Sequence, residues 1–274
     1  MRVVTQNLWG RRGDWEARRA VLVEGLRELR PDVVSLLEAV VTDEYDQVRD
    51  VLGPDFHVVH RQVREPGDGE DVEPGQGESL ASRWPFGEVR ELELHLTPRT
   101  AGFECGIIAA EVQAPEPLGT FLFAFYNPSW KLYMEYEREL QAVAAAKFLE
   151  EFDGGRGLHI VLATDLDADP ASASARFWTG RQALDATSVC YRDAWESAHP
   201  DEPGHTFTPE TPIMIGGDWP FRRIDYILVR CGEHEGPTLD IARCDRIFVE
   251  PVDGVWASDH FGVMADLEVP SAAR

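Results

Sequence analysis

Short runs of apolar residues, rich in Val, Ile, Leu and Phe, recur along the chain between polar and Gly- or Pro-containing segments. Such runs between turn-forming residues are typical of buried strands. The pattern predicts strands at 2–8, 32–38, 56–62, 88–96, 105–113, 119–126, 158–164, 224–230, 246–249 and 262–269. Because several of these strands follow one another directly, the pattern favours packed β-sheets with helices outside over a regular alternation of strand and helix.

Helical spacing of apolar residues marks two further segments. Asp14 is a suitable N-cap for the first helix, and Pro31 must end it. The second helix is predicted from about Tyr133 to Phe152, where Gly154-Gly155 ends it. A short third helix is predicted at 172–180.

The length of 274 residues suits one large domain, and neither an internal repeat nor a break in composition divides it. A hydrophobic share of 43% and a charged share of 27% exclude a disordered or collagen-like chain. We therefore predict a single domain over 1–274. Within it, 64–78 contains Gly, Pro and acidic residues with one apolar side chain, which predicts a flexible acidic surface loop.

The chain is strongly acidic, since 26 Lys and Arg residues against 49 Asp and Glu residues give a net charge of −23 at pH 7. Proteins that neutralise the phosphates of nucleic acids usually carry the opposite sign, so long nucleic acid is disfavoured as a partner. A small phosphorylated substrate remains compatible with this charge, because a local metal ion can outweigh the overall field.

The sequence predicts a cytoplasmic protein. Its N-terminus lacks the pattern of a signal peptide, and no apolar run approaches the roughly 20 residues of a membrane span. The four cysteines form no CxxC pair and are expected to be reduced thiols, not zinc ligands: Cys105, Cys190, Cys231 and Cys244.

Polar residues stand where several of the apolar runs end. They are Asn7, Glu38, Asn127, Asp165, Asp167, Asp225, Asp259 and His260. An acidic side chain at the end of a buried strand is costly to desolvate unless it meets a cation or a hydrogen-bond donor. Several such acids in one domain therefore indicate convergence on a divalent metal, and ligands that are all oxygens favour Mg²⁺ or Mn²⁺ over zinc.

In this order, the motifs resemble those of the endonuclease/exonuclease/phosphatase superfamily. They are Thr5-Gln6-Asn7-Leu8-Trp9, Leu37-Glu38, Ser82-Arg83-Trp84-Pro85, Thr164-Asp165-Leu166-Asp167, Arg223-Ile224-Asp225-Tyr226 and Ser258-Asp259-His260-Phe261. The resemblance implies a DNase I-like fold, which is a four-layer α/β sandwich with two central, mainly antiparallel β-sheets flanked by helices. It also implies metal-dependent hydrolysis of a phosphate ester.

The resemblance further implies a role for each matching residue. Glu38 matches the principal metal ligand, and Asn7 lies beside it to hold the metal or a phosphate oxygen. Asp259 matches a further carboxylate for the metal site or for acid/base chemistry. Asp165, with Asp167 in the same motif, matches the acidic group that orients and deprotonates the attacking water. The implied cofactor is Mg²⁺ or Mn²⁺.

His260 matches the histidine that contacts the scissile phosphate, and Asp225 matches its hydrogen-bonded partner. In-line displacement at phosphorus needs such a donor besides a positioned nucleophile and a cation on the non-bridging oxygens. Candidates for substrate binding are Asn7, Arg83, Asn127, His205 and Arg222.

Three positions depart from the family pattern. Asp167 stands where the family has an asparagine, so a carboxylate replaces an amide that donates to phosphate, and a metal or a proton must compensate unless the substrate group is less anionic. Tyr126 resembles the tyrosine of a Tyr-x-Pro pattern in the abasic-site endonuclease branch, which predicts a catalytic phosphate donor. Thr164 replaces a glycine and is expected to narrow the approach to the site.

Two alternatives to a small-molecule phosphoesterase remain open at this point. One is a nuclease acting on DNA or RNA, and the other is a scaffold recruited to small-molecule binding or non-hydrolytic tailoring chemistry. The stretch 178–222 bears on this choice, because its aromatic and arginine residues either line a pocket for a ring or form a hydrophobic cluster under a long loop. The sequence predicts no oligomeric state.

Overall fold

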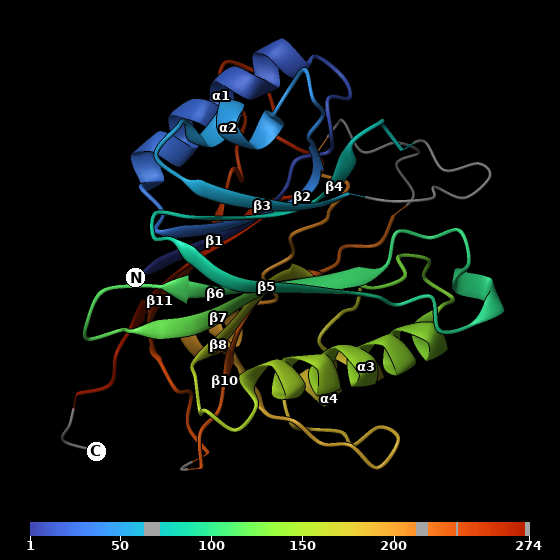
Figure 1. Cartoon of the computed structure of the whole chain (residues 1–274). Helices are drawn as coiled ribbons and strands as arrows, with labels where there is room; N and C mark the ends of the chain where they lie inside the picture. Colours follow the sequence, from blue (N-terminus) through green and yellow to red (C-terminus); the bar gives the residue numbers. More distant parts are fainter. Residues whose placement is uncertain (63–71, 212–218, 234, 272–274) are drawn as a thin grey trace.

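The computed structural model describes residues 1–62, 72–211, 219–233 and 235–271. Two six-stranded sheets pack face to face, and helices cover the outer face of each sheet (Figure 1). The order of the layers is helices, sheet, sheet, helices. This is the four-layer α/β sandwich that the sequence predicts.

The first sheet carries α1 (Trp15–Leu29) and α2 (Gln47–Leu52) on its outer face. Its strand order is β11 (Asp240–Ile247), β12 (Gly262–Glu268), β1 (Arg2–Asn7), β2 (Val33–Val40), β4 (Gln76–Ser82) and β3 (His57–Gln62). Only β1 and β2 pair in parallel.

The second sheet carries α3 (Glu135–Asp153) and α4 (Ala173–Trp178) on its outer face. Its strand order is β5 (Phe86–Glu93), β6 (Gly106–Gln113), β7 (Thr120–Asn127), β8 (Ile160–Asp165), β10 (Asp225–Arg230) and β9 (Tyr191–Asp193). Here only β7 and β8 are parallel, so both sheets are mainly antiparallel, as predicted. The short elements η1 (Pro98–Thr100) and α5 (Ala194–Ala198) lie outside the strands, and α5 packs against β10 and β11.

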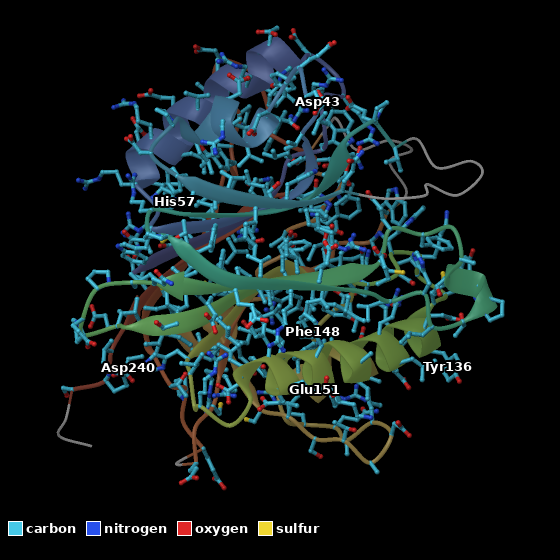
Figure 2. All side chains as sticks on the ribbon, in the orientation of Figure 1. Asp43, His57, Tyr136, Phe148, Glu151 and Asp240 are labelled. Atoms are coloured by element: carbon cyan, nitrogen blue, oxygen red, sulfur yellow. The ribbon has the colours of Figure 1, made fainter. Side chains whose placement is uncertain are left out.

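The central strands are apolar on both faces because both faces are covered. Val3 lies in the core between the two sheets, whereas Val4 lies in the core beneath α1. In β7, Phe123 faces the other sheet and Leu122 faces α3. Successive side chains of a strand point to opposite faces, so a strand between two cores reads as one continuous apolar run. Side chains fill all three spaces between the layers (Figure 2).

The helix boundaries follow the sequence signals. A carboxylate oxygen of Asp14 accepts the backbone N–H of Ala17 at 3.2 Å and caps α1, whose C-cap residue Arg30 stands directly before Pro31. The C-cap residue of α3 is Gly154, whose φ of 58° lies in the left-handed region that glycine tolerates best. The predicted helices are therefore confirmed.

Several strands and helices lie in polar segments, where the apolar pattern did not predict them. Of the predicted acidic loop 64–78, residues 64–71 lie outside the described residues, whereas Gln76–Glu78 are wrong as a loop because they begin β4 and are buried. The burial is possible because Glu78 pairs with Arg61 of β3 at 2.7 Å. β11 begins six residues before the predicted 246–249, in a polar stretch. α2, β9 and α5 were not predicted, since elements this short depend on their neighbours for stability. No described helix is both long enough and apolar enough to span a membrane.

Candidate active site

Strand ends from both sheets meet at one edge of the sandwich. The C-terminal ends of β1, β2, β7 and β8 lie there beside the N-terminal ends of β4 and β10 and the loop before β12, around a cavity of about 500 Å³. Eight of the residues singled out from the sequence line this cavity: Asn7, Glu38, Asn127, Asp165, Asp167, Arg222, Asp259 and His260. Side chains from almost the whole length of the chain therefore share one site.

The two-residue repeat of the strands brings most of these side chains together. Asp165 has the same phase along β8 as Val161, and Asn127 has the same phase along β7 as Phe123. Both apolar residues belong to the core between the sheets. The polar side chains therefore lie at the edge of that core, where the packed apolar side chains meet solvent. Asn7 has the same phase along β1 as Val3 and lies at the same edge.

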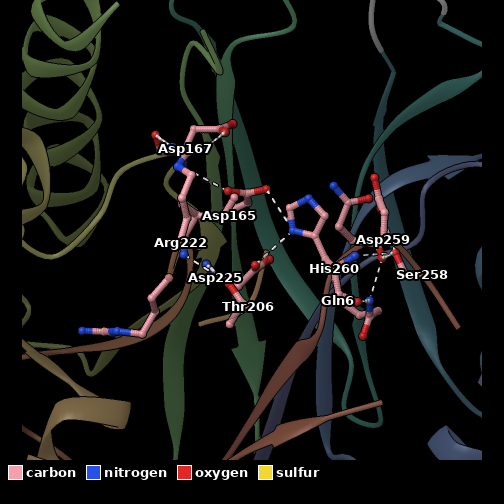
Figure 3. Close-up of polar contacts among 12 residues, drawn as sticks. Gln6, Asp165, Asp167, Thr206, Arg222, Asp225, Ser258, Asp259 and His260 are labelled. Carbon is pink, nitrogen blue, oxygen red and sulfur yellow. Dashed lines mark hydrogen bonds and ion pairs between the residues drawn. The ribbon is translucent and has the colours of Figure 1, made fainter. Parts of the chain in front are cut away.

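One ring nitrogen of His260 faces the carboxylates of both Asp165 and Asp225 (Figure 3). Asp165 and Asp225 are direct cross-strand partners in β8 and β10. Nδ1 of His260 lies 3.0 Å from Oδ2 of Asp225 and 3.8 Å from Oδ2 of Asp165. Like charges directly opposite each other destabilise a sheet, so a protonated imidazole between them relieves the repulsion.

This arrangement determines the charge of the histidine. Burial favours neutral His260, but the carboxylates of Asp225, Asp259 and Asp165 outweigh burial and hold the pKa of His260 well above its usual value. Nδ1 is engaged by Asp225, whereas Nε2 has no hydrogen-bond partner within the described parts of the chain. The carboxylates therefore favour the protonated form of His260, in which the N–H at Nε2 is available at the cavity.

Asp165 is the second strongly perturbed group. Burial raises the pKa of Asp165 well above its usual value, and the charges of Asp167 and Asp225 raise it further. The backbone N–H of Asp167 donates to Oδ1 of Asp165 at 2.9 Å and fixes the carboxylate. A carboxyl group of this kind is a better proton acceptor than an exposed aspartate.

A β-bulge turns Glu38 into the cavity. The pairing of β2 with β4 shifts between Leu36 and Ala39, and Glu38 has a φ of 54°, in the left-handed region. Without the bulge, the side chain after Leu37 would face α1, because Leu37 faces the other sheet. Instead, Oε1 of Glu38 accepts from Nδ2 of Asn7 at 3.2 Å, and Oε2 pairs with Arg12 at 2.7 Å.

The surroundings of Glu38 fit a divalent cation. Burial raises the pKa of Glu38, as does the negative charge of Asp259, and Arg12 and Asn7 only partly oppose them. Two carboxylates and an amide side chain supply the oxygen ligands that Mg²⁺ and Mn²⁺ prefer, and a cation would relieve the repulsion between the acids. Glu38, Asp259 and Asn7 are thus the side chains that would hold the ion.

The ligand atoms of Asp165, Asp225 and His260 also lie within 4.8 Å of one another. Because Nδ1 of His260 is hydrogen-bonded to Asp225, that nitrogen is not free to bind a metal. This cluster suits proton transfer and hydrogen bonding better than metal ligation.

Arg222 compensates in part for the aspartate at position 167. Nη1 of Arg222 lies 3.7 Å from Oδ1 of Asp167, and Nη2 donates to the backbone carbonyl of the same residue. Burial raises the pKa of Asp167, whereas the guanidinium of Arg222 lowers it. The carboxylate that stands in place of an amide therefore has a cation beside it.

Asn127 is fixed by its amide nitrogen. Nδ2 donates to Oε1 of Glu78 and to the backbone carbonyl of Glu104, each at 3.1 Å. Both amide hydrogens are thereby used, so the oxygen is the part of the amide left for a ligand in the cavity.

Tyr126 does not belong to the site. By the alternation of β7 it faces the core beneath α3, where its ring packs against Trp178 at 5.7 Å and its hydroxyl donates to the carbonyl of Arg138 at 3.5 Å. The prediction of a catalytic tyrosine is therefore wrong. Thr164 has the same outward phase and bonds to the carbonyl of Tyr126, so it does not narrow the cavity.

Two predicted substrate-binding residues also lie elsewhere. Arg83 donates to the carbonyl of Pro31 at 2.8 Å and stacks over Phe56, away from the cavity. His205 packs against Phe221 outside the cavity lining. Each has a local structural partner that accounts for its position.

The cavity lining includes residues that sequence reasoning did not select. They are Trp9, Arg12, Gln76, Glu104, Trp130 and Lys131. Arg12 follows Asn7 in a glycine-containing turn, and Trp130 follows Asn127 by three residues, so nearness to a strand-end motif was the available signal. From the stretch 178–222, Phe207 and Trp219 line the cavity, whereas Trp178 is buried in the core beneath α3 and α4.

Tyr126→Phe is expected to leave kcat and KM within about twofold of the wild-type values, because the lost hydroxyl makes one long hydrogen bond away from the cavity. Steady-state kinetics on any ester that the protein hydrolyses checks this. A loss of tenfold or more would restore a role for the phenol in phosphate binding.

Asp165→Asn is expected to raise the melting temperature by about 2 °C or more in EDTA at neutral pH. The folded pKa of Asp165 lies above the unfolded one, so stability is highest below the unfolded pKa and is lost as pH rises through the folded pKa. The asparagine side chain of the variant does not ionise, so its stability does not fall in this way as pH rises. Thermal denaturation at about pH 5 and pH 8 should show the gain mainly at the higher pH, whereas exposed Asp43→Asn should show none.

Comparisons with known proteins agree with this geometry. The Endonuclease/Exonuclease/phosphatase family matches residues 4–260. The human Nocturnin catalytic domain with bound sulfate superposes with a TM-score of 0.75 at 18% identity, over 98% of this chain and 94% of that one. TDP2 of D. rerio, complexed with single strand DNA product, gives 0.74 at 18% identity, over 98% and 99%. No curated protein matches the sequence.

A third solved structure, the endonuclease/exonuclease/phosphatase from Beutenbergia cavernae, gives a TM-score of 0.70 at 21% identity, over 99% of this chain and 72% of that one. At such identities the solved structures establish the fold. The family match establishes the type of enzyme, so the predictions of this superfamily and of a metal-dependent hydrolase of phosphate esters are confirmed.

Proposed function

Because the chain belongs to the Endonuclease/Exonuclease/phosphatase family, we propose that it hydrolyses a phosphate ester of a small phosphorylated molecule or short nucleotide with Mg²⁺ or Mn²⁺. The observation that carries the proposal is that Glu38, Asp165 and His260 line one cavity. These three residues supply a cation site, a proton acceptor and a hydrogen-bond donor, which are the groups that attack by water at phosphorus requires.

In this mechanism each side chain acts at a defined point. Asp165, oriented by the N–H of Asp167, accepts a proton from the attacking water. His260, held by Asp225, donates from Nε2 to a phosphate oxygen as negative charge develops there. Glu38, Asp259 and Asn7 would hold the ion, whose positive charge would offset the negative charge of the phosphate oxygens.

The size and charge of the cavity support a small substrate. A volume of about 500 Å³ lies within the usual range for small-ligand pockets. The cavity lining holds more acidic than basic side chains, so an anionic ester depends on Lys131, His260 and the bound cation, and a net charge of −23 disfavours a long polyanion. We place the enzyme in the cytoplasm, and this assignment is supported by four cysteines that are all free thiols.

The test is hydrolysis by the purified full chain of p-nitrophenyl phosphate, bis(p-nitrophenyl) phosphate and a short single-stranded DNA. At least one small ester should be cleaved, with loss of activity in EDTA and recovery with Mg²⁺ or Mn²⁺. Absence of cleavage with either ion would refute the proposal, and EDTA-resistant cleavage would refute the role of the metal. Preferential, salt-sensitive cleavage of long DNA would favour the nuclease alternative.

A further inference from the structure

Three aromatic side chains follow one another along the cavity, packed edge to face or at a tilt, starting beside the histidine. The ring of Phe207 lies 4.7 Å from that of His260, Trp219 lies 5.6 Å from Phe207, and Trp130 lies 6.5 Å from Trp219. Phe207, Trp219 and Trp130, here called the aromatic wall, all line the cavity. None of the catalytic steps described above uses them.

The backbone at both ends of the wall is firmly held. Phe207 exchanges two backbone hydrogen bonds with Arg222, at 3.0 and 2.9 Å, and forms a bridge with His260. At the other end, Nη1 of Arg138 donates to the carbonyls of Ser129 and Lys131 at 2.8 and 2.7 Å, and so fixes the residues on both sides of Trp130. Phe207 is therefore preorganised relative to His260, and the backbone on both sides of Trp130 is fixed as well.

Positive charge lies at both ends of the aromatic wall, and at the Phe207 end Arg222 is also paired with Asp167 of the lining. Nζ of Lys131 lies 3.5 Å from the ring centroid of Trp130, and Arg222 adjoins Phe207. The acidic groups Glu38 and Asp259 belong to the cation site. A ligand with a phosphate at His260 would extend its organic part along the aromatic wall.

We propose that the aromatic wall binds a planar aromatic ring joined to the scissile phosphate, directly or through a sugar, so that the substrate class is aryl or nucleoside phosphate esters. This inference rests on the proposed phosphoesterase function. Flat indole and phenyl faces favour stacking of another ring, and every nucleobase has a face suited to this. The cationic Lys131 further suits a group attached to an anion.

The ligand comparison uses the full chain carrying Asp165→Asn, with Mg²⁺, so that bound esters are not consumed. Isothermal titration calorimetry with adenosine 5′-monophosphate and ribose 5-phosphate is expected to show at least about tenfold tighter binding of the nucleotide. Phenyl phosphate should likewise bind more tightly than cyclohexyl phosphate. Equal affinities within both pairs would overturn the inference, and a preference for cyclohexyl over phenyl would show an apolar but not a ring-specific wall, which overturns it too.

Two variants locate the preference in the aromatic wall. Trp219→Leu and Trp130→Leu, each in the same background, are expected to weaken nucleotide binding about tenfold and to narrow the gap to ribose 5-phosphate. Trp15→Leu is the matched control, because Trp15 of α1 packs against the core beneath that helix and lies outside the cavity lining. This variant should leave the difference in affinity between the nucleotide and ribose 5-phosphate unchanged. If both variants keep the full preference for the nucleotide over ribose 5-phosphate, the assignment of ring binding to the aromatic wall is refuted.

The inference and the proposed function fail in different ways. If the wild-type chain hydrolyses small esters with metal but binds the nucleotide and ribose 5-phosphate equally, the inference is wrong and the function stands. If the ring preference is present but no ester is hydrolysed under any metal condition, the wall binds rings and the proposed function is wrong.

Discussion

His260→Ala is expected to lower kcat for phosphate ester hydrolysis by about 10³-fold. Asp225 and Asp165 both face Nδ1 of the imidazole, so its Nε2–H is already oriented when charge develops on the phosphate. Removal of one preorganised donor in a water-excluded site typically has an effect of this size. The measurement is steady-state kinetics with saturating Mg²⁺, together with circular dichroism to confirm folding.

Asp225→Asn tests the charge of the histidine while the imidazole itself is kept. The carboxylate of Asp225 raises the pKa of His260, so its removal should lower that pKa and move the alkaline decline of the pH–rate profile to lower pH. His205→Ala is the matched control, because His205 lies outside the cavity lining and should keep full activity. Wild-type rates for His260→Ala would exclude the histidine as a catalytic group.

Glu38→Gln is expected to reduce activity by about 10³-fold at a Mg²⁺ concentration that saturates the wild type, because a carboxylate ligand is lost from the cation site. A second readout does not depend on activity. Mg²⁺ at about 100 times its dissociation constant should stabilise the wild type by roughly 2.7 kcal/mol, which raises the melting temperature by about 5 °C or more.

In Glu38→Gln this thermal shift should largely disappear. Exposed Glu24→Gln is the control, since Glu24 pairs with Arg27 on the outer face of α1, and it should retain the full shift. An unchanged shift in Glu38→Gln would place the ion at other residues, and the cluster of Asp165, Asp225 and His260 would then be the next candidate.

Much of the fold was determined by local sequence. The apolar runs located most of the central strands, and the signals at Asp14, Pro31 and Gly154 placed the helix ends. The polar residues that end the strands also identified seven of the 19 residues that line the cavity. These features depend on a residue and its near neighbours, so they can be read without knowledge of the fold.

Tertiary structure alone decided which side chains face the cavity. Because β7 is buried on both faces, its apolar run does not reveal whether Tyr126 or Asn127 faces the other sheet, and the catalytic role predicted for Tyr126 is therefore wrong. Glu38 points into the site only through a bulge in its pairing with β4, a strand whose polar residues concealed it. Strand phase, bulges and buried ion pairs such as Arg61–Glu78 depend on partners distant in the chain, so only the packed sheets fix them.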